Sequence, residues 1–254
     1  MGRKKQRRTS RSAAVYIPAC VLLILTLTIL GTSVFLRVLE VEVIGSSMYS
    51  QDEILNASGI MIGDNLLFLD TEGIRLQLVA AMPFIREVTI TRVPPYTLRI
   101  EIAESTAIAK IAFLDSTLVI DSGGRILSLI EGSPATLIEI RGFTPVDVVE
   151  GSQLRAELGG SMQLEYMIDM LSAIEREGMY RSVSYLDVTN ISAISFGYRD
   201  RYRVILGGPG NVRSKLRQLP GAVANIETRD ASDVPYVINM SDPSGEWNFK
   251  PDTT

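Results

Sequence analysis

The sequence predicts an α+β protein in three parts: an apolar N-terminal helix, a small β-α-α-β-β domain, and a larger β-rich domain with two packed helices. Three observations predict this. Residues 13–36 carry no charge, residues 37–105 hold three alternating apolar–polar runs with two helical stretches between the first and second, and residues 106–242 hold more alternating runs and two amphipathic stretches. A chain of 254 residues is long enough for all three.

The N-terminal segment predicts a single transmembrane helix behind a basic tail. Residues 1–12 hold six bases and no acid, and the uncharged run 13–36 exceeds the roughly 20 residues that span a bilayer. No small-residue cleavage site follows it, which favours an uncleaved anchor over a signal peptide. Because the bases precede the run, we expect residues 1–12 in the cytoplasm and residues 37–254 outside it, in a single-pass protein of the cell membrane.

The composition excludes several classes of function. Of the 25 bases, six lie in residues 1–12, so residues 37–254 hold 19 bases against 29 acids. A nucleic-acid-binding domain concentrates bases on its folded part, so we expect no nucleic-acid partner. The chain has one cysteine, Cys20, and no histidine. Zinc sites built from these residues, His-assisted nucleophiles and an internal disulfide are therefore excluded.

The small domain begins with a strand and continues with two helices. The run 37–45 alternates apolar and polar residues, which is typical of a half-buried strand. Ser50 and Glu53 form the capping-box pattern that starts a helix, and Gly59 is a natural residue to end it. A second helix follows, with its apolar stripe ending at Pro83.

Two more strands complete the small domain. The runs 84–92 and 97–104 alternate on either side of a turn at "VPPYT". Two helices covering one face of a three-stranded sheet make an α+β layer with a modest core.

The larger domain reads as strands joined by tight turns, with two helices. Residues 161–177 carry an apolar stripe at helical spacing, and residues 211–227 resemble a helix interrupted at Pro220 and Gly221. A last strand is expected over residues 234–240, and residues 243–254 are expected to form a polar C-terminal tail.

No motif predicts catalysis, a metal site or a cofactor. The glycine-rich stretch 207–211 lacks the Gly-Lys-Ser/Thr that completes a phosphate loop, so it predicts a turn. Neither Gly-x-Ser-x-Gly nor Ser-x-x-Lys occurs, and the acids are scattered over expected solvent faces. We therefore predict a protein that is not an enzyme and has no small-molecule substrate.

The last strand is the best candidate for a functional surface. If it is an edge strand, its free N–H and C=O groups can pair with a partner strand, and two nearby aromatic side chains can anchor that partner. The alternative is that the strand is interior and both aromatics cover the core. The predicted partner-binding residues are Tyr236, Val237, Ile238, Asn239, Met240, Trp247 and Phe249.

Several motifs resemble the FtsQ/DivIB family of cell-division proteins. "VEVIGSSMYSQDEILNASGIMIGDNLLFLD" is similar to the family's V-x-V-x-G, S-x-x-E-I and G-I-x-x-G-x-N-L-L patterns, which belong to a POTRA domain. "MPFIREVTITRVPPYTLRIEIAES" is similar to its L-P-W-I, R-x-x-P and T-L-x-I patterns. Looser similarity continues through "VILGGPGNVRSKLRQLPGAV" and "PYVINMSDPSGEWNFKP". The sequence departs from the family at Phe84, where Trp is common, and after Glu104, where E-R-x-P is common.

The resemblance implies a POTRA domain over 37–105, an FtsQ-type β domain over 106–242 and a role as a bitopic, non-enzymatic divisome scaffold at the septum. It also implies partners of the FtsB/DivIC and FtsL types, bound along the last strand, and an influence through them on septal peptidoglycan synthesis. Two alternatives stay open. One is a POTRA-bearing component of a secretion or protein-assembly system, and the other is a membrane-tethered cell-wall enzyme.

Overall fold

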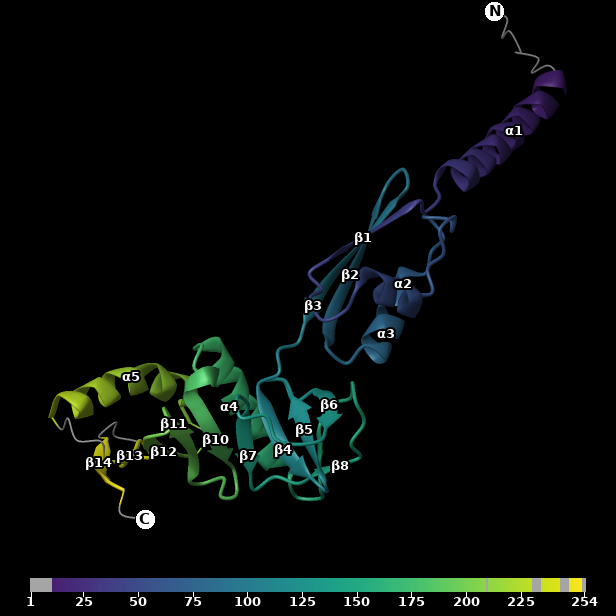
Figure 1. Cartoon of the computed structure of the whole chain (residues 1–254). Helices are drawn as coiled ribbons and strands as arrows, with labels where there is room; N and C mark the ends of the chain where they lie inside the picture. The colour runs from purple at the N-terminus through teal and green to yellow at the C-terminus, as the bar shows by residue number, and fades with distance from the viewer. Residues whose placement is uncertain (1–10, 209, 230–233, 243–246, 253–254) are drawn as a thin grey trace, which may run out of the picture. The chain divides into compact units, whose positions relative to one another are not determined.

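A computed structural model of the chain describes residues 11–208, 210–229, 234–242 and 247–252, and side chains within its first helix only in part. The chain divides into two compact units. Unit 1 comprises Met1–Leu78 and Glu87–Ala103, and unit 2 comprises Val79–Arg86 and Glu104–Thr254. Each unit has its own sheet, which Figure 1 shows by label and colour.

The N-terminal helix α1 (Arg11–Phe35) forms where the sequence predicted a membrane helix. Among the described residues, however, no helix combines the length and the apolar character that a membrane crossing needs. The prediction of a single transmembrane helix, which was part of the predicted fold class, is therefore wrong.

Unit 1 holds a three-stranded sheet in the order β1-β3-β2. Strand β1 (Glu40–Ile44) runs parallel to β3 (Thr97–Glu104), and β2 (Ile85–Val93) lies on the other side of β3. The helices α2 (Gln51–Ser58) and α3 (Thr71–Ala81) stand between β1 and β2 in the chain. The predicted β-α-α-β-β order is thus present.

Local sequence signals explain where the helices of unit 1 begin and end. The Ser50 side chain accepts a hydrogen bond from the Glu53 N–H at 3.3 Å, and the Glu53 carboxylate accepts one from the Ser50 N–H at 2.8 Å. Gly59 ends α2 in the left-handed conformation. The predicted capping box is confirmed. The buried apolar side chains of the unit include Val41, Ile54, Leu66, Ile74, Leu78, Val88, Leu98 and Ile100.

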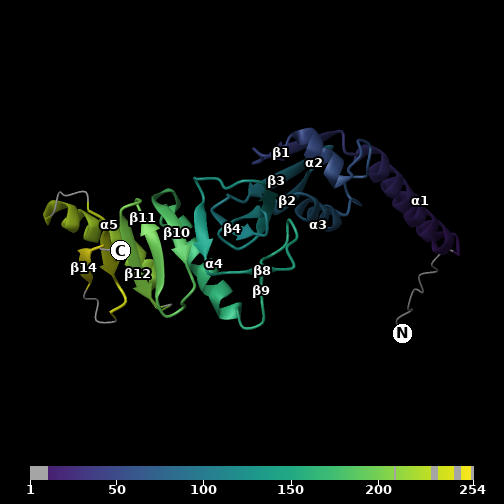
Figure 2. The same ribbon diagram turned by 60° about the horizontal axis from the view of Figure 1, so that its bottom comes forward.

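Unit 2 is built on a nine-stranded sheet in the order β14-β13-β12-β11-β10-β7-β4-β5-β6. In chain order its strands are β4 (Ala109–Phe113), β5 (Ser116–Ile120), β6 (Ile126–Ile130), β7 (Ile138–Arg141), β10 (Val183–Asp187), β11 (Ile194–Tyr198), β12 (Tyr202–Gly207), β13 (Tyr236–Asn239) and β14 (Asn248–Pro251). The short pair β8 (Pro145–Val146) and β9 (Arg155–Ala156) forms a separate two-stranded sheet. Figure 2 shows the strands from β14 to β10 side by side.

Two helices cover one face of the large sheet. They are α4 (Ser161–Arg176) and α5 (Val212–Arg229), and a 3₁₀ turn η1 (Tyr180–Ser182) follows α4. Their buried side chains join one cluster with the inward side chains of the strands; its helix members are Met167, Met170, Leu171, Ala173, Ile174, Leu216, Leu219, Val223 and Ile226. The predicted β-rich domain with two packed helices is therefore present.

Glu177 at the end of α4 links the two helices. Its carboxylate accepts hydrogen bonds from Arg213 and Arg217 of α5, both at 3.1 Å. The bond from Arg217 and then the bond from Arg213 lower the pKa of Glu177 below its ordinary value. This pairing fixes α5, and α5 in turn packs over the β13 end of the sheet.

Candidate protein-binding edge

The strand expected to bind a partner is second from the edge of its sheet. Strand β13 pairs in parallel with β12 and antiparallel with β14, so both of its sides are occupied. The condition that residues 236–240 form an edge strand therefore does not hold. The terminal strand on this side is β14, which lies in the segment expected to be a polar tail.

The backbone groups of β13 alternate between its two neighbours. The Tyr236 N–H donates to the Arg201 carbonyl at 3.1 Å, and the Met240 N–H donates to the Ile205 carbonyl at 2.7 Å, both on the β12 side. Since successive residues of a strand point their backbone groups to opposite sides, Val237 and Asn239 face β14. The Asp252 N–H, which donates to the Pro235 carbonyl at 2.7 Å, confirms that β14 lies on that side.

The side chains of β13 belong mainly to the core. Ile238 and Met240 are fully buried, and Tyr236 and Val237 are buried. The carboxamide oxygen of Asn239 accepts hydrogen bonds from the N–H and the hydroxyl of Ser241, which shapes the turn that follows. These residues can offer a partner their backbone ladder but little side-chain surface.

The two predicted aromatic anchors both lie beside β13 but differ in how far they are buried. Trp247 is half-buried and packs against the core cluster, whereas Phe249, on β14, keeps 41% of its surface exposed. The Arg229 guanidinium lies 5.9 Å from the centre of the Phe249 ring, within the range of a cation–π contact. The structure thus brings both aromatics to the same end of the sheet.

A pocket of about 380 Å³ opens between α5 and this end of the sheet. Its lining residues are Gln218, Gly221, Ala222 and Asn225 of α5, with Ile238, Trp247 and Phe249 below them. Small residues on α5 leave the space, and apolar side chains form the opposite wall. Such a pocket suits one apolar side chain of a bound peptide.

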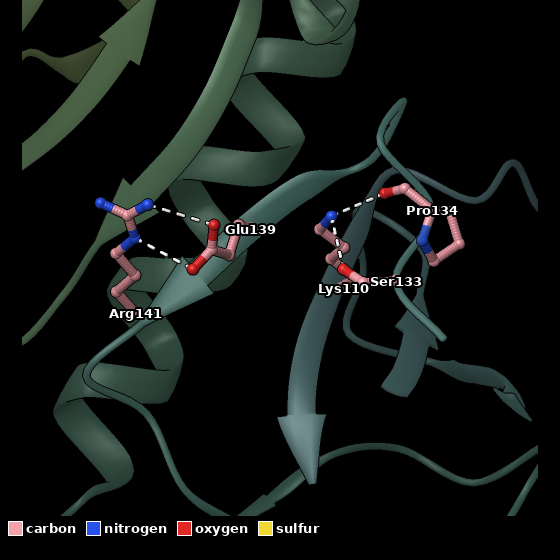
Figure 3. Close-up of polar contacts among 5 residues, drawn as sticks. All are labelled: Lys110, Ser133, Pro134, Glu139 and Arg141. Carbon is pink, nitrogen blue, oxygen red and sulfur yellow. Dashed lines mark hydrogen bonds and ion pairs between the residues drawn. The ribbon is translucent and has the colours of Figure 1, made fainter. Parts of the chain in front are cut away.

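The helix-free face of the sheet carries a polar group of residues that we tested as an alternative site (Figure 3). Lys110 donates to the Ser133 hydroxyl at 2.8 Å and to the Pro134 carbonyl at 2.6 Å, while Arg141 donates twice to Glu139, at 3.1 Å each. The bonds from Arg141 lower the pKa of Glu139. A carboxylate held ionised in this way is poorly suited to act as a general acid near neutral pH, so these contacts fit a structural role.

Within the ranges that the structure describes, no group of three or more acidic, cysteine or histidine residues could hold a metal ion. Gly207, the last residue of β12, has a left-handed backbone, and α5 begins at Val212.

Sequence reasoning missed β14, although a signal for it exists. In "WNFKP" the apolar Trp247 and Phe249 alternate with the polar Asn248 and Lys250, which is the period of a strand. The run is short and ends in proline, and that made a tail the simpler interpretation.

Comparison with known proteins shows that this chain is similar to cell-division proteins. Residues 36–105 match the family described as "POTRA domain, FtsQ-type". The cell division protein FtsQ of Corynebacterium glutamicum is 27% identical over 80% of this chain and 86% of its own length. The cell division protein DivIB of Clostridium acetobutylicum is 22% identical over 81% of this chain and 82% of its own length. FtsQ of Anaeromyxobacter sp. is 30% identical, over 63% of this chain and 57% of its own length.

Proposed function

The chain belongs to the FtsQ/DivIB family of cell-division proteins, and from this premise we propose that it is a non-enzymatic scaffold that recruits partners of the FtsB/DivIC and FtsL types. Its role lies in the divisome. We propose that it acts at the division septum. Through its partners it would influence septal peptidoglycan synthesis.

We place the binding surface at the β13–β14 end of the large sheet. The observation that carries this proposal is the combination found there: a terminal strand with all four residues exposed, two aromatic side chains and a pocket under α5. Strand addition supplies backbone hydrogen bonds, and a pocket for alternate side chains supplies specificity. The residues proposed to take part are Tyr236, Val237, Ile238, Asn239, Met240, Trp247 and Phe249.

The chain contains a built-in reporter for this surface. Trp247 is its only tryptophan and lines the pocket, so a partner bound there should change the tryptophan emission. The test titrates the full-length chain with a purified, tryptophan-free FtsB/DivIC-type protein from the same organism. We expect saturable binding together with a shift in emission.

A pair of variants makes the test specific. Trp247→Ala removes the reporter, so the affinities of the variants are measured by isothermal titration calorimetry. Trp247→Ala should weaken binding at least about tenfold, the size expected when an aromatic anchor is removed. Leu158→Ala is the matched control, because Leu158 is a fully exposed apolar residue before α4. Binding with unchanged emission and equal affinity in both variants would place the interface elsewhere. Absence of binding by the wild type would remove the proposed recruitment of this partner.

A further inference from the structure

Strand β14 is held to the sheet much less firmly than its neighbour. All four of its residues are exposed, it pairs on one side only, and it contributes no side chain to the buried core cluster. Its main side-chain contact is the Phe249 ring at the pocket and beside Arg229. Ladder hydrogen bonds alone stabilise weakly, because the unpaired strand can bond to water instead.

Strand β13 would remain in place if β14 left. Ile238 is fully buried under α5, and four residue pairs join β13 to β12. Its bonds to β12 do not use the backbone groups of Val237 and Asn239 that face β14. Loss of β14 would therefore uncover two N–H groups and two carbonyls on an ordered strand beside the pocket.

The charges around β14 also favour a different strand in its place beside β13. Val237 lies opposite Arg203 on one side and opposite Lys250 on the other, so two cations stand two strands apart on the same face. Strand spacing puts such positions about 9.5 Å apart, where like charges repel mildly. A strand with an acidic or neutral residue in place of Lys250 would be held better.

We propose that the edge of β13 that pairs with β14 is a binding surface for an extended partner segment. The strand β14 occupies this edge until the partner segment displaces it. The segment would place an apolar side chain opposite Ile238, in the position of Phe249. It would place an acidic or polar residue opposite Val237, in the position of Lys250. The identity of the partner rests on the proposed function, whereas the surface itself does not.

A reversible lock on β14 tests the proposal in the full-length chain. Val237 and Lys250 are register partners of the hydrogen-bonded kind, and such positions have Cα atoms about 5.5 Å apart, which lies within the range of a disulfide. The variant is Val237→Cys with Lys250→Cys in a Cys20→Ser background, since Cys20 is the only native cysteine. Oxidation holds β14 on β13, and a reductant releases it.

The first arm needs no partner protein. Its probe is a fluorescent peptide with the sequence of residues 246–254, measured by anisotropy. Phe249→Asp in the full-length chain should bind the peptide at least about tenfold more tightly than the wild type, because its own β14 loses the aromatic contact. The oxidised lock should not bind it, and reduction should restore binding. Equal binding by the oxidised and reduced forms would overturn the proposal.

The second arm repeats the comparison with a purified FtsB/DivIC-type protein. We expect the oxidised lock to lose at least about tenfold in affinity and the reduced form to recover it. Equal affinity of both forms would show that the partner adds to the outer edge of β14, which would overturn replacement as its mode of binding. If the first arm succeeds while this partner binds neither form, the surface stands and the proposed function fails.

Discussion

Val237 offers the sharpest single-residue test of how β13 meets a partner. Its N–H and C=O face the β14 side, and its neighbours on β13 bond to β12. Val237→Pro therefore removes a donor only from the side where we expect the partner, and β12 keeps its bonds. Val237→Ala is the matched control, since it trims the side chain and keeps the N–H.

The expected loss of binding free energy in Val237→Pro has two sources, the lost hydrogen bond and the steric effect of the proline ring. A lost ladder bond costs about 0.5–1.5 kcal/mol, and the proline ring also intrudes on the incoming strand. We expect a total loss of roughly 1.5–3 kcal/mol of binding free energy, which is about 10- to 150-fold in Kd. The alanine control should change Kd less than about threefold, because Val237 is buried and offers a partner little side-chain surface.

The assay is isothermal titration calorimetry with an FtsB/DivIC-type protein, alongside thermal unfolding followed by circular dichroism. Equal Kd values for the proline and alanine variants would refute the argument that this side of β13 carries the interaction. A proline variant that no longer unfolds cooperatively would refute the assignment of its N–H to the β14 side.

Three further predictions concern stability, each measured by urea unfolding. Ser50→Ala should destabilise unit 1 by about 1 kcal/mol through loss of the helix cap, with Asn56→Ala at an exposed position of α2 as the control. Hydrogen bonds from the Ser50 hydroxyl and N–H lower the pKa of Glu53 below its ordinary value of 4.5. The stability that the Glu53 carboxylate adds to the cap is therefore present above pH 4.5 and should disappear as the pH falls through the lowered pKa. Unchanged acid sensitivity of unfolding in Ser50→Ala would contradict this. Gly45→Ala should cost at least about 2 kcal/mol, because Gly45 has φ +87° and a Cβ would meet the Ile102 carbonyl oxygen; a neutral result would contradict this geometry. Ile238→Ala should cost about 2–5 kcal/mol as a fully buried residue, and a loss under 1 kcal/mol would argue against its position under α5.

Local sequence signals were sufficient for much of the fold. The capping box at Ser50 and Glu53 depends on residues three apart, and the structure contains it. The order of strands in a sheet depends on residues far apart in the chain. Nothing local in 37–45 indicates that β1 runs parallel to β3, and the pairing appears only when the whole unit is assembled.

Helix α5 shows why a local signal can mislead. Pro220 and Gly221 predicted an interruption, but the helix runs unbroken from Val212 to Arg229. An internal proline costs about 3 kcal/mol. Leu216 and Leu219 before it, and Val223 and Ile226 after it, are all buried, and burial of four such side chains contributes roughly 6–12 kcal/mol. The tertiary contacts therefore outweigh the local penalty.

The structure brings residues 236–240, Trp247 and Phe249 to one end of the large sheet, but the sequence did not predict their arrangement there. The mainly apolar run 236–240 was correctly predicted to be a strand, but an interior strand and an edge strand can share such a run. The difference lies in β14, whose four residues gain stability from pairing rather than from burial. Hydrophobic periodicity, the main signal in a sequence, is weakest for such a strand.

Site-specific photocrosslinking in dividing cells of the source organism tests the central claim most directly. A photoreactive phenylalanine analogue would replace Trp247 in one strain and Leu158 in another, and adducts would be probed for the FtsB/DivIC-type protein. We predict an adduct from position 247 and none from position 158. Adducts of equal yield from both positions, or none from 247 in cells that still divide, would contradict recruitment at the β13–β14 end of the sheet.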